Sequence, residues 1–352
     1  MAPVAILAVS AVAVVAILLL KPKLGDDPAA AVAAGRWDVD CAAEKAGDFK
    51  CFQQHYQALV AGSGVAAAMT DMKDAYEKSE FVKGNCHQLV HVVGRAAGDK
   101  FGDVAKAYAD GDNFCWSGYY HGVMESILTK IGVAEVKTKL NTICAGISTD
   151  QKYSFYHYNC VHGLGHGVMA VNNNELFDAL TTCDSLTDWW ERESCFGGVF
   201  MENIMSEFNP DHETKYLKTD DLMYPCNAVN QTYKQQCFLM QTSHALQVTG
   251  YDFDRVFALC DKVESGFRPT CYQSLGRDAS GNTISDAIRT RDICMRGRDF
   301  DARSNCIVGA VKDFVSYYHS QEAGEKLCAT LTDTAIRELC TSTAKSHNLG
   351  SK

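Results

Sequence analysis

Residues 253–271 read FDRVFALCDKVESGFRPTC and contain the repeating unit of the second half of the chain. Phe253, Val256 and Cys260 follow the i, i+3, i+7 spacing of an amphipathic helix. Cys271 comes eleven positions after Cys260, beyond a short stretch that contains Gly and Pro. The stretch therefore predicts a helix that ends near one cysteine, a short loop, and a second helix that begins near the next cysteine.

The cysteines repeat this unit with a nearly constant period. The first series is Cys226, Cys260, Cys294 and Cys328, and the second is Cys237, Cys271, Cys306 and Cys340. Successive members are 34 residues apart in the first series and 34 or 35 apart in the second. Such a period is typical of arrays of two-helix repeats. The sequence contains no alternating Val/Ile/Thr run of the kind that indicates β-strands. The sequence therefore predicts an all-α solenoid of two-helix hairpins, each about 34 residues long.

The sixteen cysteines also predict eight disulfides. Seven pairs would each staple one hairpin: Cys41–Cys51, Cys144–Cys160, Cys183–Cys195, Cys226–Cys237, Cys260–Cys271, Cys294–Cys306 and Cys328–Cys340. Cys86 and Cys115 are left over and pair by elimination. Unpaired buried cysteines would not explain this register, and the chain lacks the Cys-x2–4-Cys clusters of zinc sites. A glycine three residues after the second cysteine, such as Gly309, would let a neighbouring helix approach closely.

The N-terminal segment predicts a membrane anchor. Residues 2–20 read APVAILAVSAVAVVAILLL, and nineteen helical residues rise roughly 28 Å, close to the thickness of a bilayer core. A cleaved signal peptide is the alternative, but it would normally carry Lys or Arg before the apolar run. Lys21 and Lys23 favour a cytosolic domain. Disulfides persist only in oxidising compartments, so we expect a periplasmic, intermembrane-space or extracellular domain instead.

The sequence pattern divides the chain into five parts. They are a transmembrane helix over 1–20, a linker over 21–37, histidine-rich helical repeats over 38–175, regular cysteine-paired repeats over 176–346 and a tail over 347–352. The composition is that of an ordinary globular protein, with 47% hydrophobic and 22% charged residues. The net charge of −10 argues against nucleic acid as a partner.

Histidine concentrates in the early repeats, where three i, i+4 pairs occur: His87/His91, His121/Glu125 and His162/His166. Each pair lies on one face of a helix and can hold a metal ion. Counted from the preceding cysteine, the second and third pairs fall within an arc of about 80° on two successive second helices. His91 falls outside that arc and is a weaker member. Facing pairs of this kind predict a Cu, Zn or Fe site.

Structural histidines are the favoured interpretation of this region, because histidine beside glycine and tyrosine often lies in tight helix packing, and the metal site is the second interpretation. Glu202, on the next second helix, could be a fifth ligand, although a solvated helix face is the more ordinary interpretation. The chain has no Cys-x-x-Cys-His motif for c-type haem. It also has no G-x-S-x-G, P-loop or H-E-x-x-H motif. The sequence thus predicts no catalytic residue and favours a non-enzymatic role.

The arrangement resembles tetratricopeptide and Sel1-like repeats over residues 180–345, and above all the cysteine-rich Sel1 proteins of bacteria. Residues 271–276, CYQSLG, are similar to the Cys–Leu–Gly element of that group. The cysteines are further apart here, and the Gly-rich loop is missing. The resemblance implies a solenoid whose concave face binds a protein partner. We therefore expect a membrane-anchored binding or scaffold protein. The second hypothesis is a metalloprotein in metal handling, electron transfer or a metal-dependent reaction.

Overall fold

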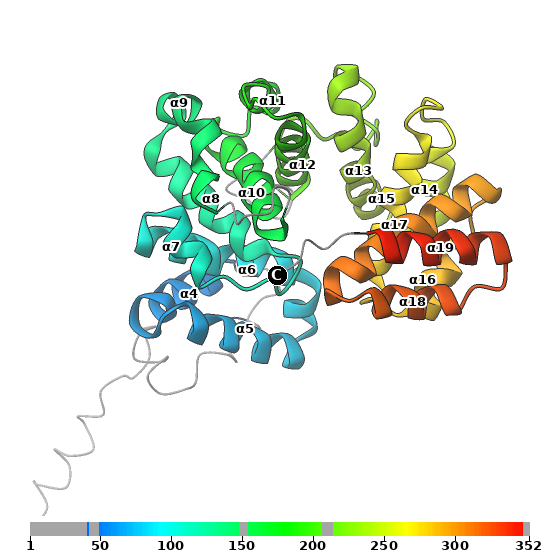
Figure 1. Cartoon of the computed structure of the whole chain (residues 1–352), viewed down its shortest axis with the longest axis horizontal. Coiled ribbons are helices and arrows are strands. Elements are labelled where there is room, and N and C mark those ends of the chain that lie inside the picture. The colour runs from blue at the N-terminus through cyan, green and yellow to red at the C-terminus, as the bar shows by residue number, and fades with distance from the viewer. Residues whose placement is uncertain (1–40, 42–48, 148–153, 206–213, 348–352) are drawn as a thin grey trace, which may run out of the picture. The chain divides into compact units, whose positions relative to one another are not determined.

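The computed structural model describes residues 41, 49–147, 154–205 and 214–347 of the 352-residue chain. Within these ranges the protein is all-helical and has no strands (Figure 1). The predicted anchor over 1–20 and the linker over 21–37 lie outside the described ranges. Among the helices that are described, none has both the length and the hydropathy of a membrane span.

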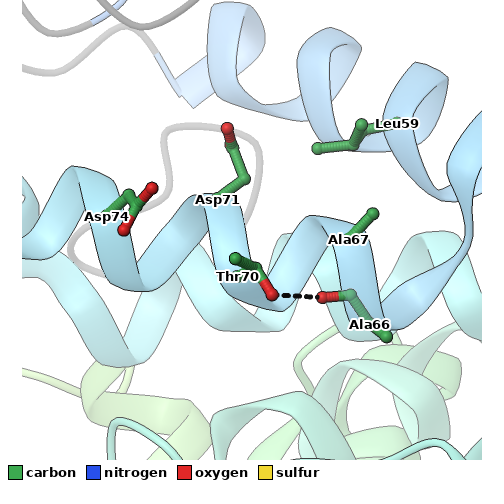
Figure 2. A pocket seen from close by; sticks show the side chains of 6 residues that line it. All are labelled: Leu59, Ala66, Ala67, Thr70, Asp71 and Asp74. Atoms are coloured by element: carbon green, nitrogen blue, oxygen red, sulfur yellow. Dashed lines mark hydrogen bonds between the residues drawn. The ribbon is translucent and has the colours of Figure 1, made fainter.

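The chain divides into two compact units, residues 1–84 and 85–352. In the first unit, helix α4 (Phe49–Ser63) packs against α5 (Val65–Lys78). The two helices line an open pocket of about 440 Å³, shown in Figure 2, whose lining residues are Leu59, Ala66, Ala67, Thr70, Asp71 and Asp74. All the predicted metal ligands belong to the second unit, and the expected division at residue 175 also falls inside it.

Short and long helices make up the second unit, and helix α6 (Glu80–Phe101) crosses the boundary into it. The long helices are α8 (Gly118–Ile131), α10 (Phe155–Val171), α12 (Trp189–Met205), α13 (Gln231–Val248), α15 (Arg268–Asn282), α17 (Phe300–Tyr318) and α19 (Thr334–Ser346). The shorter ones are α7 (Val104–Ala109), α9 (Val133–Ile143), η1 (Ala145–Ile147), α11 (Leu176–Cys183), α14 (Phe253–Cys260), α16 (Ala287–Cys294) and α18 (Gln321–Ala329). From α8 to α19, each long helix packs against the next one along the chain (Figure 1).

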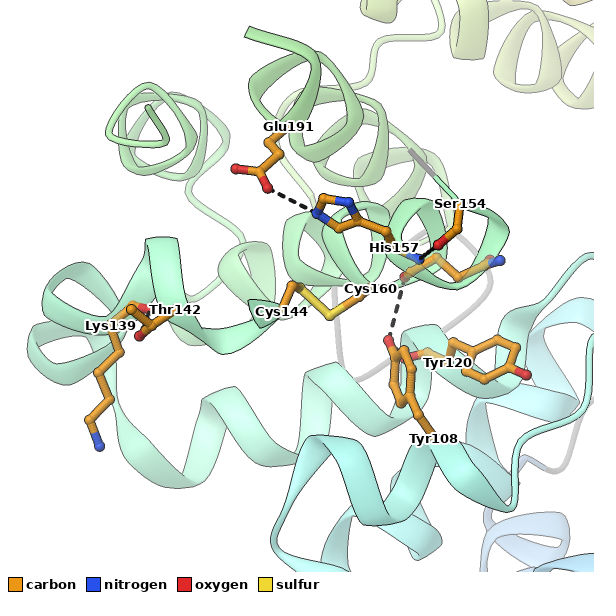
Figure 3. The surroundings of a disulfide bond; sticks show 10 residues. Tyr108, Tyr120, Lys139, Thr142, Cys144, Ser154, His157, Cys160 and Glu191 are labelled. Carbon is orange, nitrogen blue, oxygen red and sulfur yellow. Dashed lines mark hydrogen bonds and ion pairs between the residues drawn. A yellow bond between two sulfur atoms is a disulfide. The ribbon is translucent and has the colours of Figure 1, made fainter. Parts of the chain in front are cut away.

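The structure contains the eight disulfides that the sequence predicts, seven from the cysteine spacing and Cys86–Cys115 by elimination. They are Cys41–Cys51, Cys86–Cys115, Cys144–Cys160, Cys183–Cys195, Cys226–Cys237, Cys260–Cys271, Cys294–Cys306 and Cys328–Cys340. In the last three hairpins they join the end of a short helix to the early turns of a long one. Cys260, for example, is the last residue of α14, and Cys271 lies in the first turns of α15. Figure 3 shows the same arrangement at Cys144–Cys160, between α9 and α10.

Glycines let three pairs of long helices approach until backbone meets backbone. The pairs are α6/α8, α10/α12 and α15/α17. Each helix of a pair contributes one glycine whose added Cβ atom would overlap a carbonyl oxygen of the facing helix: Gly94 and Gly122, Gly165 and Gly198, Gly276 and Gly309. Gly198 and Gly309 each lie three residues after a cysteine. The expected close approach at these positions is therefore confirmed.

Candidate metal centre

Four neighbouring helices bring five histidines and two glutamates together in the second unit. Helix α6 carries His87 and His91, α8 carries His121 and Glu125, α10 carries His162 and His166, and α12 carries Glu202. We call these seven residues the His/Glu cluster. Six of them are buried, with at most 5% of each residue exposed. His87 is partly exposed and therefore forms the solvent edge of the cluster.

The glycine contacts set the distance between the helices that carry the cluster. Gly122 of α8 lies against the backbone of His91 on α6, and Gly198 of α12 lies against the backbone of His162 on α10. Because the backbones are so close, the Glu125 and Glu202 side chains can reach histidines on the facing helix. A larger residue at either glycine would push the helices apart, since protein interiors are close-packed.

Glu125 accepts two charge-assisted hydrogen bonds. The Nδ1 atom of His91 lies 2.6 Å from Glu125 Oε1, and Arg95 Nη1 donates to Oε2 at 2.7 Å. Burial by itself raises the pKa of the Glu125 carboxyl, but His91 and Arg95 lower it by more, so this pKa lies well below its ordinary value. Glu125 is thus an ionised acceptor, and His91 must donate to it from Nδ1.

His87 has its Nδ1 atom occupied in the same way. This atom lies 2.8 Å from the carbonyl oxygen of Cys115. The other ring nitrogen, Nε2, lies 3.2 Å from Nε2 of His91. Burial and the neighbouring His91 lower the pKa of His87 to about 3, so its ring is neutral at physiological pH.

The second half of the cluster repeats this arrangement one repeat further along. His166 Nδ1 lies 2.7 Å from Glu202 Oε2, and the His121 ring stacks on the His166 ring with centroids 4.3 Å apart. Nε2 of His166 and Nδ1 of His121 are buried, and among the described residues neither has a hydrogen-bond partner. Burial, together with His166, holds the pKa of both His121 and His162 well below its ordinary value. These rings are therefore neutral.

Three sets of cluster residues have ligand atoms close enough together to hold a metal ion. The sets are His87, His91 and His121; His121, His162 and His166; and His91, Glu125, His166 and Glu202. Within each set these atoms lie within 4.8 Å of one another. The sets include all six residues that the sequence predicts as ligands, and they add Glu202.

Two expectations about the cluster differ from the structure. His91, expected at the margin, has its ring in contact with those of His87, His121 and His166. Glu202, expected on a solvated face, is 5% exposed and bonded to His166. The sequence reasoning also missed Arg95, although it lies one helical turn after His91 on α6.

His157, the remaining histidine of this region, lies outside the cluster. Its Nε2 atom is 2.9 Å from Glu191 Oε1, as Figure 3 shows. Further along the chain, Asp313 on α17 is 8% exposed and accepts a hydrogen bond from Trp116 Nε1 at 3.1 Å. Burial raises the pKa of Asp313 to about 6. Neither residue belongs to any of the three ligand sets.

Comparisons with protein-family models, curated proteins and solved structures found no match to this chain. The resemblance to tetratricopeptide and Sel1-like repeats therefore rests on the cysteine pattern and on residues 271–276.

Proposed function

We propose that the protein binds transition-metal ions in the His/Glu cluster. One observation carries the proposal, namely the 3.2 Å separation between the Nε2 atoms of His87 and His91. The positions of the ring protons explain why this contact calls for a cation.

Each of these two histidines must keep its proton on Nδ1. The carbonyl oxygen of Cys115 can only accept a hydrogen bond, so His87 donates to it from Nδ1. The Glu125 carboxylate, paired with Arg95, also only accepts, so His91 donates to it from Nδ1. When both rings are neutral, both Nε2 atoms carry lone pairs that face each other, and the contact takes a cation between them: either a proton on His91 Nε2, which then donates to His87 Nε2, or a metal ion.

A metal ion between these nitrogens would resolve the contact. Two nitrogen ligands at the usual 2.0–2.1 Å from a tetrahedral ion are about 3.3 Å apart, close to the observed 3.2 Å. Histidine ligands commonly donate their other ring N–H to a carboxylate or a backbone carbonyl, which orients the ring. His87, His91 and His166 all have their Nδ1 atom paired in this way. Glu125 and Glu202 therefore act as orienting partners of the ligands.

The ligand chemistry narrows the choice of ion. Imidazole nitrogens suit Zn, Cu, Fe and Ni, whereas Ca and Mg prefer oxygen ligands. An ion would enter from the side of His87, the partly exposed member of the cluster. The eight disulfides fit an oxidising, extracytoplasmic location. We place the protein there, with residues 1–20 as the proposed anchor and the helical hairpins stacked as a solenoid. Protein-partner binding on a concave face stays a prediction.

Elemental analysis of the full chain tests the proposal. The chain is purified in detergent, its affinity tag is removed, and Cu, Zn and Fe are each offered before dialysis. Wild type should retain metal, and the double variant His91→Ala/His166→Ala should not. His347→Ala is the control, because this ring contacts Ser316 outside the cluster. The proposal is wrong if wild type retains no more metal than the double variant.

A further inference from the structure

The cluster has more imidazoles than one ion normally takes. Transition-metal sites such as those of zinc use three or four protein ligands, whereas five histidine rings contact one another here. They also divide by helix, with His87 and His91 on α6 and with His162 and His166 on α10. His121, on α8, is the fifth.

His121 lies at the centre of the five rings. Its ring centroid is 5.2 Å from those of both His87 and His91, 5.0 Å from that of His162 and 4.3 Å from that of His166. It is the one residue shared by the two three-histidine ligand sets among the described residues. Each set therefore consists of one α6 or α10 pair plus His121.

The hydrogen bonds distinguish His121 from the other rings. Nδ1 is paired with an acceptor in His87, His91 and His166. In His121, of which only 2% is exposed, Nδ1 is buried and has no partner in the part of the chain that the structure describes. A buried polar atom with no partner is destabilising, and a second cation at this edge of the ring would supply the missing interaction.

We infer that the cluster holds two metal ions with His121 as a bridging ligand. One ion is bound by His87, His91 and His121, and the other by His121, His162 and His166. This inference rests on the proposed metal binding and adds the number of ions and the ligand they share. An imidazole that bridges two ions loses its ring proton, so one proton per chain passes from His121 to solvent when the second ion binds.

Copper(II) titration of the full chain in detergent tests this inference. Wild type should bind two Cu(II) ions per chain. Two Cu(II) ions joined by an imidazolate are magnetically coupled, so the EPR signal should fall well below that of two isolated ions. His121→Ala should abolish the coupling and weaken the binding of both ions.

Single variants show which ligands belong to which ion. His87→Ala and His162→Ala each remove a ligand that only one set contains. Each variant should bind one ion tightly and show the full EPR signal of an isolated Cu(II). His347→Ala should behave as wild type. Helix content measured by circular dichroism identifies any variant that does not fold. If a variant does not fold, the copper stoichiometry and the EPR signal of wild type decide whether two coupled ions are bound.

The outcomes separate this inference from the proposed function. No bound copper in wild type overturns both. One ion per chain overturns the two-ion centre and leaves the metal-binding proposal standing. Two ions with an undiminished EPR signal overturn the bridging role of His121. Two coupled ions in wild type, with one uncoupled ion in each single-ligand variant, support the inference.

Discussion

The early helices α8 and α10 and the later helices α15 and α17 share a packing scheme but differ in chemistry. Six residues after the cysteine, the early helices carry His121 and His166, and the later ones carry Arg277 and Lys312. Arg277 Nη2 donates to Asp278 Oδ1 at 2.6 Å and to Ser243 Oγ at 2.7 Å. In the early helices, by contrast, one ring nitrogen of each histidine at this position is buried and has no partner among the described residues.

In both regions, neighbouring helices enclose a buried layer of side chains. The residue six positions after the cysteine decides the chemistry of that layer. Close glycine contacts occur in both regions, at α10/α12 and at α15/α17. A guanidinium in that layer pairs with nearby acids and has no lone pair for a metal. A neutral imidazole there presents a lone pair, which a metal ligand requires.

Replacing Glu125 should destabilise the early region strongly. Glu125→Ala leaves the Nδ1–H of His91 without its acceptor and Arg95 without its counter-ion. Removal of one partner from a buried ion pair costs about 3–5 kcal/mol. Urea unfolding in the presence of a chelator measures the effect without metal. The control in the later region is Glu322→Ala. The Glu322 side chain is 76% exposed and pairs with Lys326, so its removal should change the unfolding free energy far less. If Glu125→Ala and Glu322→Ala lowered the unfolding free energy equally, Glu125 would not be a buried counter-ion.

Asp313 should give the later region its own pH dependence. Its pKa is raised from 3.8 to about 6, and Arg277 and Asp278 lie near it. A carboxyl with a raised pKa binds more protons in the folded state, so its contribution to stability is complete below about pH 4 and is lost as the pH rises through about 6. The shift of about two units corresponds to about 3 kcal/mol. Asp313→Asn should remove this contribution, so the difference in unfolding free energy between variant and wild type should favour the variant at pH 8 and vanish near pH 4. A pH-independent difference would contradict the raised pKa.

The glycine contacts should have equal structural effects and unequal functional ones. Gly198→Leu and Gly309→Leu each place a side chain against a facing backbone. Overpacking of this kind typically costs about 1–3 kcal/mol. Gly198→Leu should also weaken metal binding, because it separates α12 and Glu202 from His166. Gly309→Leu should leave the metal content unchanged. Loss of metal in both variants would mean that the later helices also shape the cluster.

Much of the helical architecture follows from local sequence features. The cysteine pairs whose partners are eleven or twelve positions apart predicted the disulfides of the later hairpins, because a short loop allows few other pairings. Cys86–Cys115, with a separation of 29 residues, followed only by elimination. The geometry of the cluster was harder to predict. The predicted arc of ligands requires Cys115 to be helical, but Cys115 to Ser117 have positive φ, and α8 begins at Gly118.

The residue order alone predicts the all-helical fold, the disulfide pairs and the region where histidines gather, because all of these depend on spacing along one chain segment. The role of each cluster residue depends on contacts across helices. Glu125 and His91 are 34 residues apart, and Glu202 and His166 are 36 apart. Whether they meet depends on the offset and separation of neighbouring helices, which the paired glycines set. No periodicity within a single helix contains that information, so the buried carboxylate–histidine pairs and the central place of His91 emerge only when the helices pack.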